Sequence, residues 1–73
     1  MPASIAEMNE PLATKIRKIL EQRGFSQAAI ARKAGYSRQD LSYMLNGRKI
    51  IKVCDIVKIA KAMQIPPEDL FKE

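Results

Sequence analysis

Two helical segments separated by a very short connection constrain this chain more than any other feature. Ser26 is a good N-cap for a segment with helical spacing that reaches residue 33 or 34. Ser37 is a good N-cap for the next helix and lies only two residues after Gly35. A connection of about three to four residues that contains glycine is typical of two helices that cross at a steep angle. This pair is therefore expected to lie at the centre of the fold.

Further helical segments flank this pair. Apolar residues with helical spacing begin at Leu12, and Gly24 is a suitable end for that helix. Asn46-Gly47 is a strong stop signal, and Pro66-Pro67 interrupts a later apolar pattern. The sequence thus predicts an all-α fold, a compact five-helix bundle, in one domain over residues 12–73. The expected helices are about 12–23, 27–34, 38–46, 52–64 and 67–71.

Residues 1–11 lack sustained periodicity and end at Pro11, so we predict a flexible N-terminal tail. This segment lacks the basic and apolar regions of a signal peptide. No apolar run approaches the roughly 18–20 residues of a membrane span. Together with a single thiol, Cys54, these features predict a cytoplasmic protein. The tail also lacks Lys and Arg, so we do not expect it to act as an arm in the DNA minor groove.

Composition and charge restrict the function. The chain has 73 residues, no histidine and one cysteine, so it has neither an imidazole base nor a thiolate metal cage. We therefore expect no enzyme activity, no cofactor, no metal and no small-molecule ligand. The net charge of +5 is concentrated in residues 12–25 (+3) and 26–51 (+4). This distribution favours a polyanionic partner, either nucleic acid or an anionic membrane surface. The apolar arc of 52–64 is better explained as core, which argues against the membrane.

The expected helix 38–46 has two different faces. At about 100° per residue, its apolar side chains gather on one side and its long polar side chains on the other. The polar side chains are Arg38, Gln39, Ser42 and Tyr43. In a DNA major groove, Arg bonds guanine and Gln bonds adenine in a bidentate manner, and Ser is adaptable. We predict that these four residues read bases. The alternative is an ordinary solvated surface with capping residues at its start.

Several stretches carry a family resemblance: Gly-Phe-Ser-Gln (24–27), Ile-Ala-Arg-Lys-Ala-Gly (30–35), Leu-Ser-Tyr-Met-Leu-Asn-Gly (41–47) and Ile-Ala-Lys-Ala-Met (59–63). In these stretches the chain resembles the helix-turn-helix family of phage repressors and Cro proteins, the XRE family, over residues 12–71. The resemblance implies a lambda-repressor-like DNA-binding domain with its helix-turn-helix at about 27–46. It also implies a transcriptional regulator, usually a dimer on a two-fold operator.

Phosphate contacts are expected on both sides of helix 38–46. Gln27 lies at a helix N-terminus, where free backbone N–H groups attract an anion. The resemblance implies that Gln27 and Asn46 hold phosphates, although Asn46 is also a plausible helix C-cap. Arg48 and Lys49 follow at once and are predicted to contact the DNA backbone.

The chain departs from the family pattern at two places. Leu20 and Leu45 occupy positions where the family often has an Arg–Glu ion pair, so we expect an apolar contact there. Ile51-Lys52 replaces the frequent Pro-Ser, so the helix near residue 52 is expected to lack its usual cap.

The function predicted from these features is a sequence-specific repressor that reads its operator with helix 38–46. We expect a homodimer through the C-terminal segment, namely Ile65, Leu70 and Phe71. The alternative for Leu70 and Phe71 is that they cover the core of their own chain. The alternative function is a protein-interaction module on the same fold, such as an antitoxin or a regulatory partner. The polar face of helix 38–46 argues against it. The sequence does not distinguish a phage or mobile-element repressor, an antitoxin and a restriction-modification controller.

Overall fold

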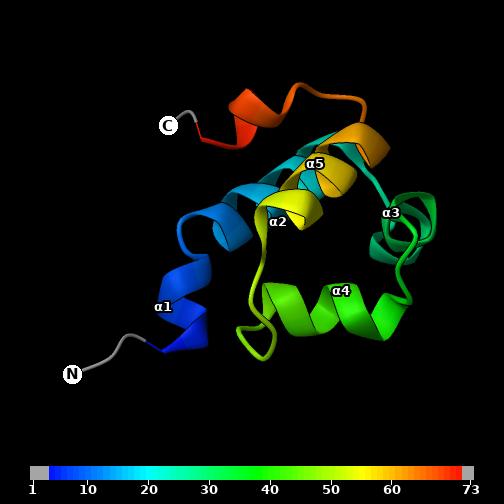
Figure 1. Ribbon diagram of the computed structural model, residues 1–73. Coiled ribbons are helices and arrows are strands. Elements are labelled where there is room, and N and C mark those ends of the chain that lie inside the picture. The colour runs from blue at the N-terminus through cyan, green and yellow to red at the C-terminus, as the bar shows by residue number, and fades with distance from the viewer. Residues whose placement is uncertain (1–3, 72–73) are drawn as a thin grey trace.

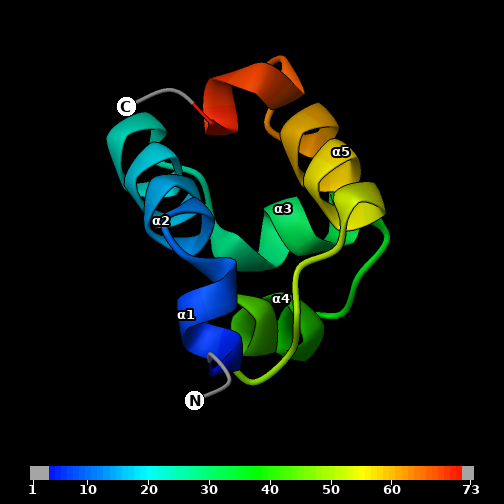
Figure 2. The same cartoon turned by 60° about the vertical axis from the view of Figure 1, so that its left-hand side comes forward.

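The structure, a computed structural model, describes residues 4–71, which form five α-helices and a short 3-10 helix without a β-strand (Figure 1). They are α1 (Ile5–Asn9), α2 (Leu12–Arg23), α3 (Gln27–Ala34), α4 (Arg38–Leu45), α5 (Val53–Ala62) and η1 (Pro67–Leu70). Seen in Figure 2, α2 and α5 lie on opposite sides of the bundle, with η1 crossing at one end. The all-α fold class is confirmed.

The α3–α4 pair forms as its caps predict. The Ser26 hydroxyl accepts a hydrogen bond from the Ala29 amide at 3.3 Å. The Ser37 hydroxyl accepts one from the Asp40 amide at 3.1 Å. Gly35 ends α3 with φ of 87°, in the left-handed region that other residues rarely adopt. The chain can therefore turn sharply and begin α4 almost at once.

The core is built from the apolar faces of α2 to α5 and is closed by the C-terminal segment. Its buried residues are Ala13, Ile16, Ile19, Leu20, Ile30, Ala31, Leu41, Met44, Leu45, Ile56, Ile59, Ala60, Ala62, Met63, Ile65 and Leu70. The small residue Ala31 is fully buried on α3, the helix that contacts both α4 and α5. Leu20 and Leu45 are both buried in this core, as expected for an apolar replacement of an ion pair.

The N-terminal segment differs from the prediction of a flexible tail over 1–11. Ser4 caps α1 by accepting a hydrogen bond from the Glu7 amide at 3.1 Å. Asn9, at the end of α1, is only 2% exposed. A five-residue helix is too short to produce a periodic apolar pattern, and the only signal available was the spacing of Ser4 and Glu7, which is typical of a helix start. Residues 1–3, and 72–73 at the other end of the chain, lie outside the described residues.

The C-terminal segment also corrects a prediction. Ile65 and Leu70 are 7% and 2% exposed, because η1 folds back against α2 and α5. The turn is made at Gln64, whose φ is 60°, and the Ile65 amide donates to the Ala60 carbonyl. Ile65 and Leu70 thus cover the core of their own chain and are not available to a partner. Of the three predicted interface residues only Phe71 is exposed, at 66%. Across the described part of the chain, no helix is long and apolar enough to cross a membrane.

Candidate nucleic-acid interface

The two faces of α4 are separated as predicted. Leu41 and Met44 are fully buried and Leu45 is 4% exposed. On the other face Arg38 and Gln39 are exposed, whereas Ser42 and Tyr43 are half-buried. The helix therefore offers one polar surface to a partner while its other side anchors it to the core.

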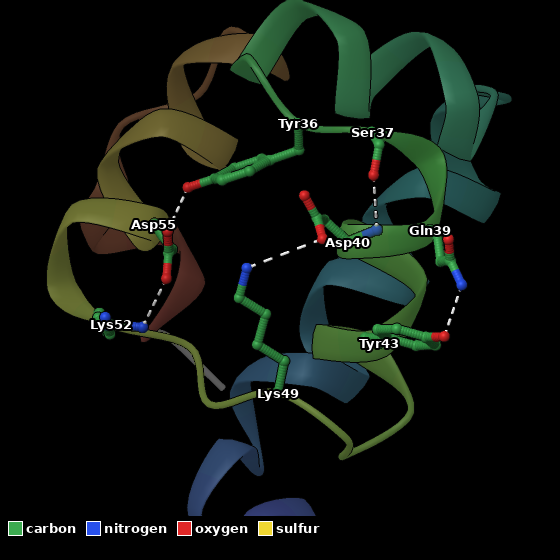
Figure 3. Close-up of polar contacts among 8 residues, drawn as sticks. All are labelled: Tyr36, Ser37, Gln39, Asp40, Tyr43, Lys49, Lys52 and Asp55. Carbon is green, nitrogen blue, oxygen red and sulfur yellow. Dashed lines mark hydrogen bonds and ion pairs between the residues drawn. The ribbon is translucent and has the colours of Figure 1, made fainter.

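Gln39, Tyr43 and Arg48 form a connected group on this surface. The side-chain amide of Gln39 donates from Nε2 to the Tyr43 hydroxyl at 2.5 Å, as Figure 3 shows. The Arg48 guanidinium carbon lies 5.8 Å from the centre of the Tyr43 ring, which is within cation–π range. Gln39 retains its second amide hydrogen and its Oε1, the two groups with which glutamine recognises adenine.

Ser42, Asn46 and Arg17 form a second group at the end of α4. Asn46 Nδ2 donates to the Ser42 hydroxyl at 3.1 Å, and Arg17 Nη2 donates to Asn46 Oδ1 at 2.9 Å. Arg17 comes from α2 and was missed by the sequence analysis. Its position at the edge of the apolar arc of α2 was the only available signal.

The last four carbonyl groups of α4, which have no partners within the helix, all accept hydrogen bonds. The Ser42 carbonyl accepts from the Asn46 amide, and the Tyr43 carbonyl accepts from the amides of Arg48 and Lys49. The other two carbonyl groups accept from side chains. The Asn9 amide donates to the Met44 carbonyl at 2.9 Å, and the Arg17 guanidinium donates to the Leu45 carbonyl. Two residues from the N-terminal part of the chain therefore hold the end of the helix that carries the polar face.

Lys49 and Asp40 lie beside each other. Lys49 Nζ is 3.9 Å from Asp40 Oδ1, and both side chains are nearly half exposed (Figure 3). An ion pair this exposed is weak, so Lys49 retains the ability to meet a phosphate. The Asp40 carboxylate thus points toward the loop that follows α4.

A buried carboxylate fixes the start of α5. Asp55 Oδ2 accepts from the Lys52 amide at 3.0 Å, and Oδ1 accepts from the Tyr36 hydroxyl. As expected, the N-cap residue Lys52 supplies no side-chain cap, and Asp55 compensates by reaching back from the first turn to the Lys52 amide. Burial alone would raise the pKa of Asp55. The two hydrogen bonds and the charges of Lys49 and Lys52 outweigh burial and lower this pKa below its usual value.

Tyr36 joins the turn between α3 and α4 to α5. Burial, together with the hydrogen bond to Asp55 and nearby negative charge, raises the pKa of Tyr36 above its usual value. Lys58 Nζ lies 5.6 Å from the centre of its ring. Tyr36 therefore ties the helix-turn-helix to the rest of the bundle. The remaining predicted phosphate contact, Gln27, is the first residue of α3 and is half-buried.

A protein-family model described as helix-turn-helix matches residues 16–70. The chain belongs to the helix-turn-helix family. This confirms the XRE-type resemblance and identifies a DNA-binding regulator of transcription. The matched range includes α3, α4 and Arg17 but begins after α1.

This helix-turn-helix protein is similar to the solved structure of the restriction-modification controller protein C.AhdI from Aeromonas hydrophila. The two chains are 27% identical with a TM-score of 0.76, over 82% of this chain and 91% of that one. No curated protein sequence matches the chain.

Proposed function

We propose that this helix-turn-helix protein is a sequence-specific repressor that places α4 in the major groove of an operator. The polar face of α4 carries the proposal. Arg38, Gln39, Ser42 and Tyr43 are the proposed base-reading residues, and the face they form holds no carboxylate. The core contacts of Leu41 and Met44 hold this helix rigidly, so its side chains meet DNA in a fixed register.

Phosphate contacts are proposed for Gln27, Asn46, Arg48 and Lys49. Gln27 is the first residue of α3 and lies where the backbone N–H groups of a helix N-terminus can meet a phosphate on one side of α4. Asn46, Arg48 and Lys49 supply donors on the other side, and Asn46 retains one amide hydrogen after its bond to Ser42. These contacts would position α4 without reading the sequence.

We further propose that two copies act on a two-fold operator. One copy of α4 spans only about four or five base pairs, and helix-turn-helix dimers place two such helices about 10 to 10.5 base pairs apart. Ile65 and Leu70 are buried, which leaves Phe71 as the one exposed residue of the predicted C-terminal interface. We therefore place the main pairing contact on Val53 and Val57 of α5, which are 77% and 47% exposed. Among the regulator classes left open by the sequence, the similarity to a restriction-modification controller favours that class.

Selection of binding sites from a library of random duplexes tests this proposal. The unmodified protein should enrich one two-fold sequence. Gln39→Ala and Arg38→Ala should each remove discrimination at one base pair per half-site, by about 1–3 kcal/mol. Arg48→Ala should instead weaken binding to every duplex about equally. If all three variants retain the original preference, α4 is not the reading element and the proposal fails.

A further inference from the structure

We propose that α1 contributes to DNA binding through Asn9. This residue sets the conformation of the loop 46–52 and thereby positions Arg48 to contact the DNA backbone. The proposal rests on the proposed function for its DNA-binding consequence, but its structural half can be tested without DNA. Asn9 would act through Arg48 as a positioning residue and make no contact with DNA itself.

Both hydrogens and the oxygen of the Asn9 side-chain amide take part in hydrogen bonds. Its Nδ2 donates to the carbonyls of Met44 and Lys49, both at 2.9 Å, and its Oδ1 accepts from the Ile51 amide at 2.9 Å. The side chain is buried and satisfies three backbone groups that are 35 to 42 residues away in the chain. Only a side-chain amide offers two donors and an acceptor in one plane, so Ala cannot replace it.

These three bonds tie the loop at both ends. Met44 belongs to the last turn of α4, whereas Lys49 and Ile51 belong to the segment leading to α5. Arg48 lies between these two points, and its own amide donates to the Tyr43 carbonyl at 2.8 Å. The guanidinium of Arg48 is thereby brought to the ring of Tyr43. The loop conformation thus decides where this charge sits beside the base-reading face.

The arrangement in space supports the same conclusion. In both Figure 1 and Figure 2, α1 lies against the end of α4 from which the loop departs, and the two helices are in contact. Asn9 precedes the range matched by the helix-turn-helix family model. The side chain that makes the three hydrogen bonds therefore lies outside the matched range, whereas its partners Met44, Lys49 and Ile51 lie inside it.

Loss of the Asn9 amide should loosen the loop while the bundle stays folded. Without it, three backbone groups exchange a buried partner for water, and Arg48 has to be ordered at the moment of binding. The charge of Arg48 would remain on the chain, but its contact with one phosphate would be lost or weakened.

The first experiment measures amide hydrogen exchange by NMR in the free protein, comparing Asn9→Ala with Met8→Ala. Met8 is on the same helix and is 57% exposed, so its variant keeps the Asn9 bonds. We expect the Ile51 amide to exchange about tenfold faster in Asn9→Ala and to be unchanged in Met8→Ala. Equal protection of Ile51 in both variants would overturn the proposal. If Asn9→Ala does not fold, Asn9→Ser, which keeps one donor and one acceptor, takes its place.

The second experiment measures binding to a 20-base-pair duplex of mixed sequence at several salt concentrations. In Asn9→Ala the log–log salt slope should become shallower by about 0.9 per bound protomer, as expected for one lost phosphate contact. In the Arg48→Ala background the same change should have no further effect. Ile59→Val, which changes a buried core residue and leaves the Asn9 bonds in place, is the control for lowered stability. All variants are compared at a temperature at which circular dichroism shows them folded.

The outcomes are distinct. An unchanged slope in Asn9→Ala, or a slope that falls again in the Arg48→Ala background, would overturn the positioning role. Failure of the unmodified protein to bind any duplex would refute the proposed function and with it the DNA-binding half of this proposal. The exchange of the Ile51 amide would still decide whether Asn9 holds the loop.

Discussion

At the scale of single residues, Tyr43 restrains two side chains that would otherwise move freely in solvent. Its hydroxyl accepts from Gln39 and its ring lies next to Arg48. Holding an exposed glutamine in one conformation before binding removes part of the entropy cost of recognising a base. Tyr43 therefore connects the base-reading and phosphate-binding parts of the proposed interface.

Tyr43→Phe should separate these two roles, because it keeps the ring beside Arg48 and removes only the hydroxyl. We expect roughly 1 kcal/mol less discrimination at the base pair read by Gln39, with little change in binding to unrelated duplexes. Relative affinities for the selected operator and its single-base variants measure this. A uniform loss across all duplexes would mean that Tyr43 contacts the DNA backbone.

The sequence could indicate some of these pairings and not others. Gln39 and Tyr43 are four residues apart on one helix, so their contact follows from helical spacing. Arg17 and Asn9 act on the end of α4 from positions 28 and 35 residues away, respectively. Nothing in the local pattern reveals such partners, because they depend on how the helices pack.

At the scale of elements, the start of α5 depends on one carboxylate. Asp55 accepts hydrogen bonds from Lys52 and Tyr36, and its pKa is lowered in the folded state. A lowered folded pKa contributes stability that is complete above the unfolded value, near 3.9, and is lost as pH falls through the folded value.

Asp55→Asn should therefore reduce stability at pH 7 by about 1–2 kcal/mol and flatten the acid limb of the stability profile below about pH 4. Urea unfolding followed by circular dichroism at several pH values measures both effects. An acid limb as steep as that of the unmodified protein would assign the dependence to another carboxylate.

Helices with long apolar patterns were predictable and short elements were not. The predicted helices 12–23 and 27–34 agree with α2 and α3, because a glycine marks the end of each helix and Ser26 marks the start of α3. The segment 67–71 forms a 3-10 helix over Pro67–Leu70, since a segment of four residues that begins at the second proline is too short for regular α-helical turns. The helix α1 has no periodic apolar pattern, and its contribution comes from the polar residue Asn9.

At the scale of the whole molecule, the uneven charge predicts a strong dependence of DNA binding on salt. A dimer that makes about 6 to 10 phosphate contacts should lose about 10³-fold or more in affinity between 50 and 200 mM salt. Fluorescence anisotropy with a labelled duplex measures this directly. An affinity that does not change with salt would show that the basic surface of the chain serves solubility alone.

Pairing of two copies is the property that depends most on the tertiary fold. The sequence shows apolar residues at the C-terminus and on α5 but cannot show which of them the core needs. The structure buries Ile65 and Leu70 but leaves Phe71 exposed, together with Val53 and Val57, which lie one turn apart on α5. So small an apolar surface suits a weak dimer that tightens when both copies hold DNA.

The double variant Val53→Glu with Val57→Lys tests this surface. The net charge of the chain stays at +5, a glutamate suits the first turn of a helix, and the new pair has favourable spacing. The fold and the electrostatic attraction to DNA should therefore be preserved. Analytical ultracentrifugation with the selected two-fold operator should give two unmodified protomers per duplex at saturation, and one protomer of the variant at the same concentration. Two variant protomers per duplex would place the contact elsewhere, and a single unmodified protomer would make this regulator a monomeric reader.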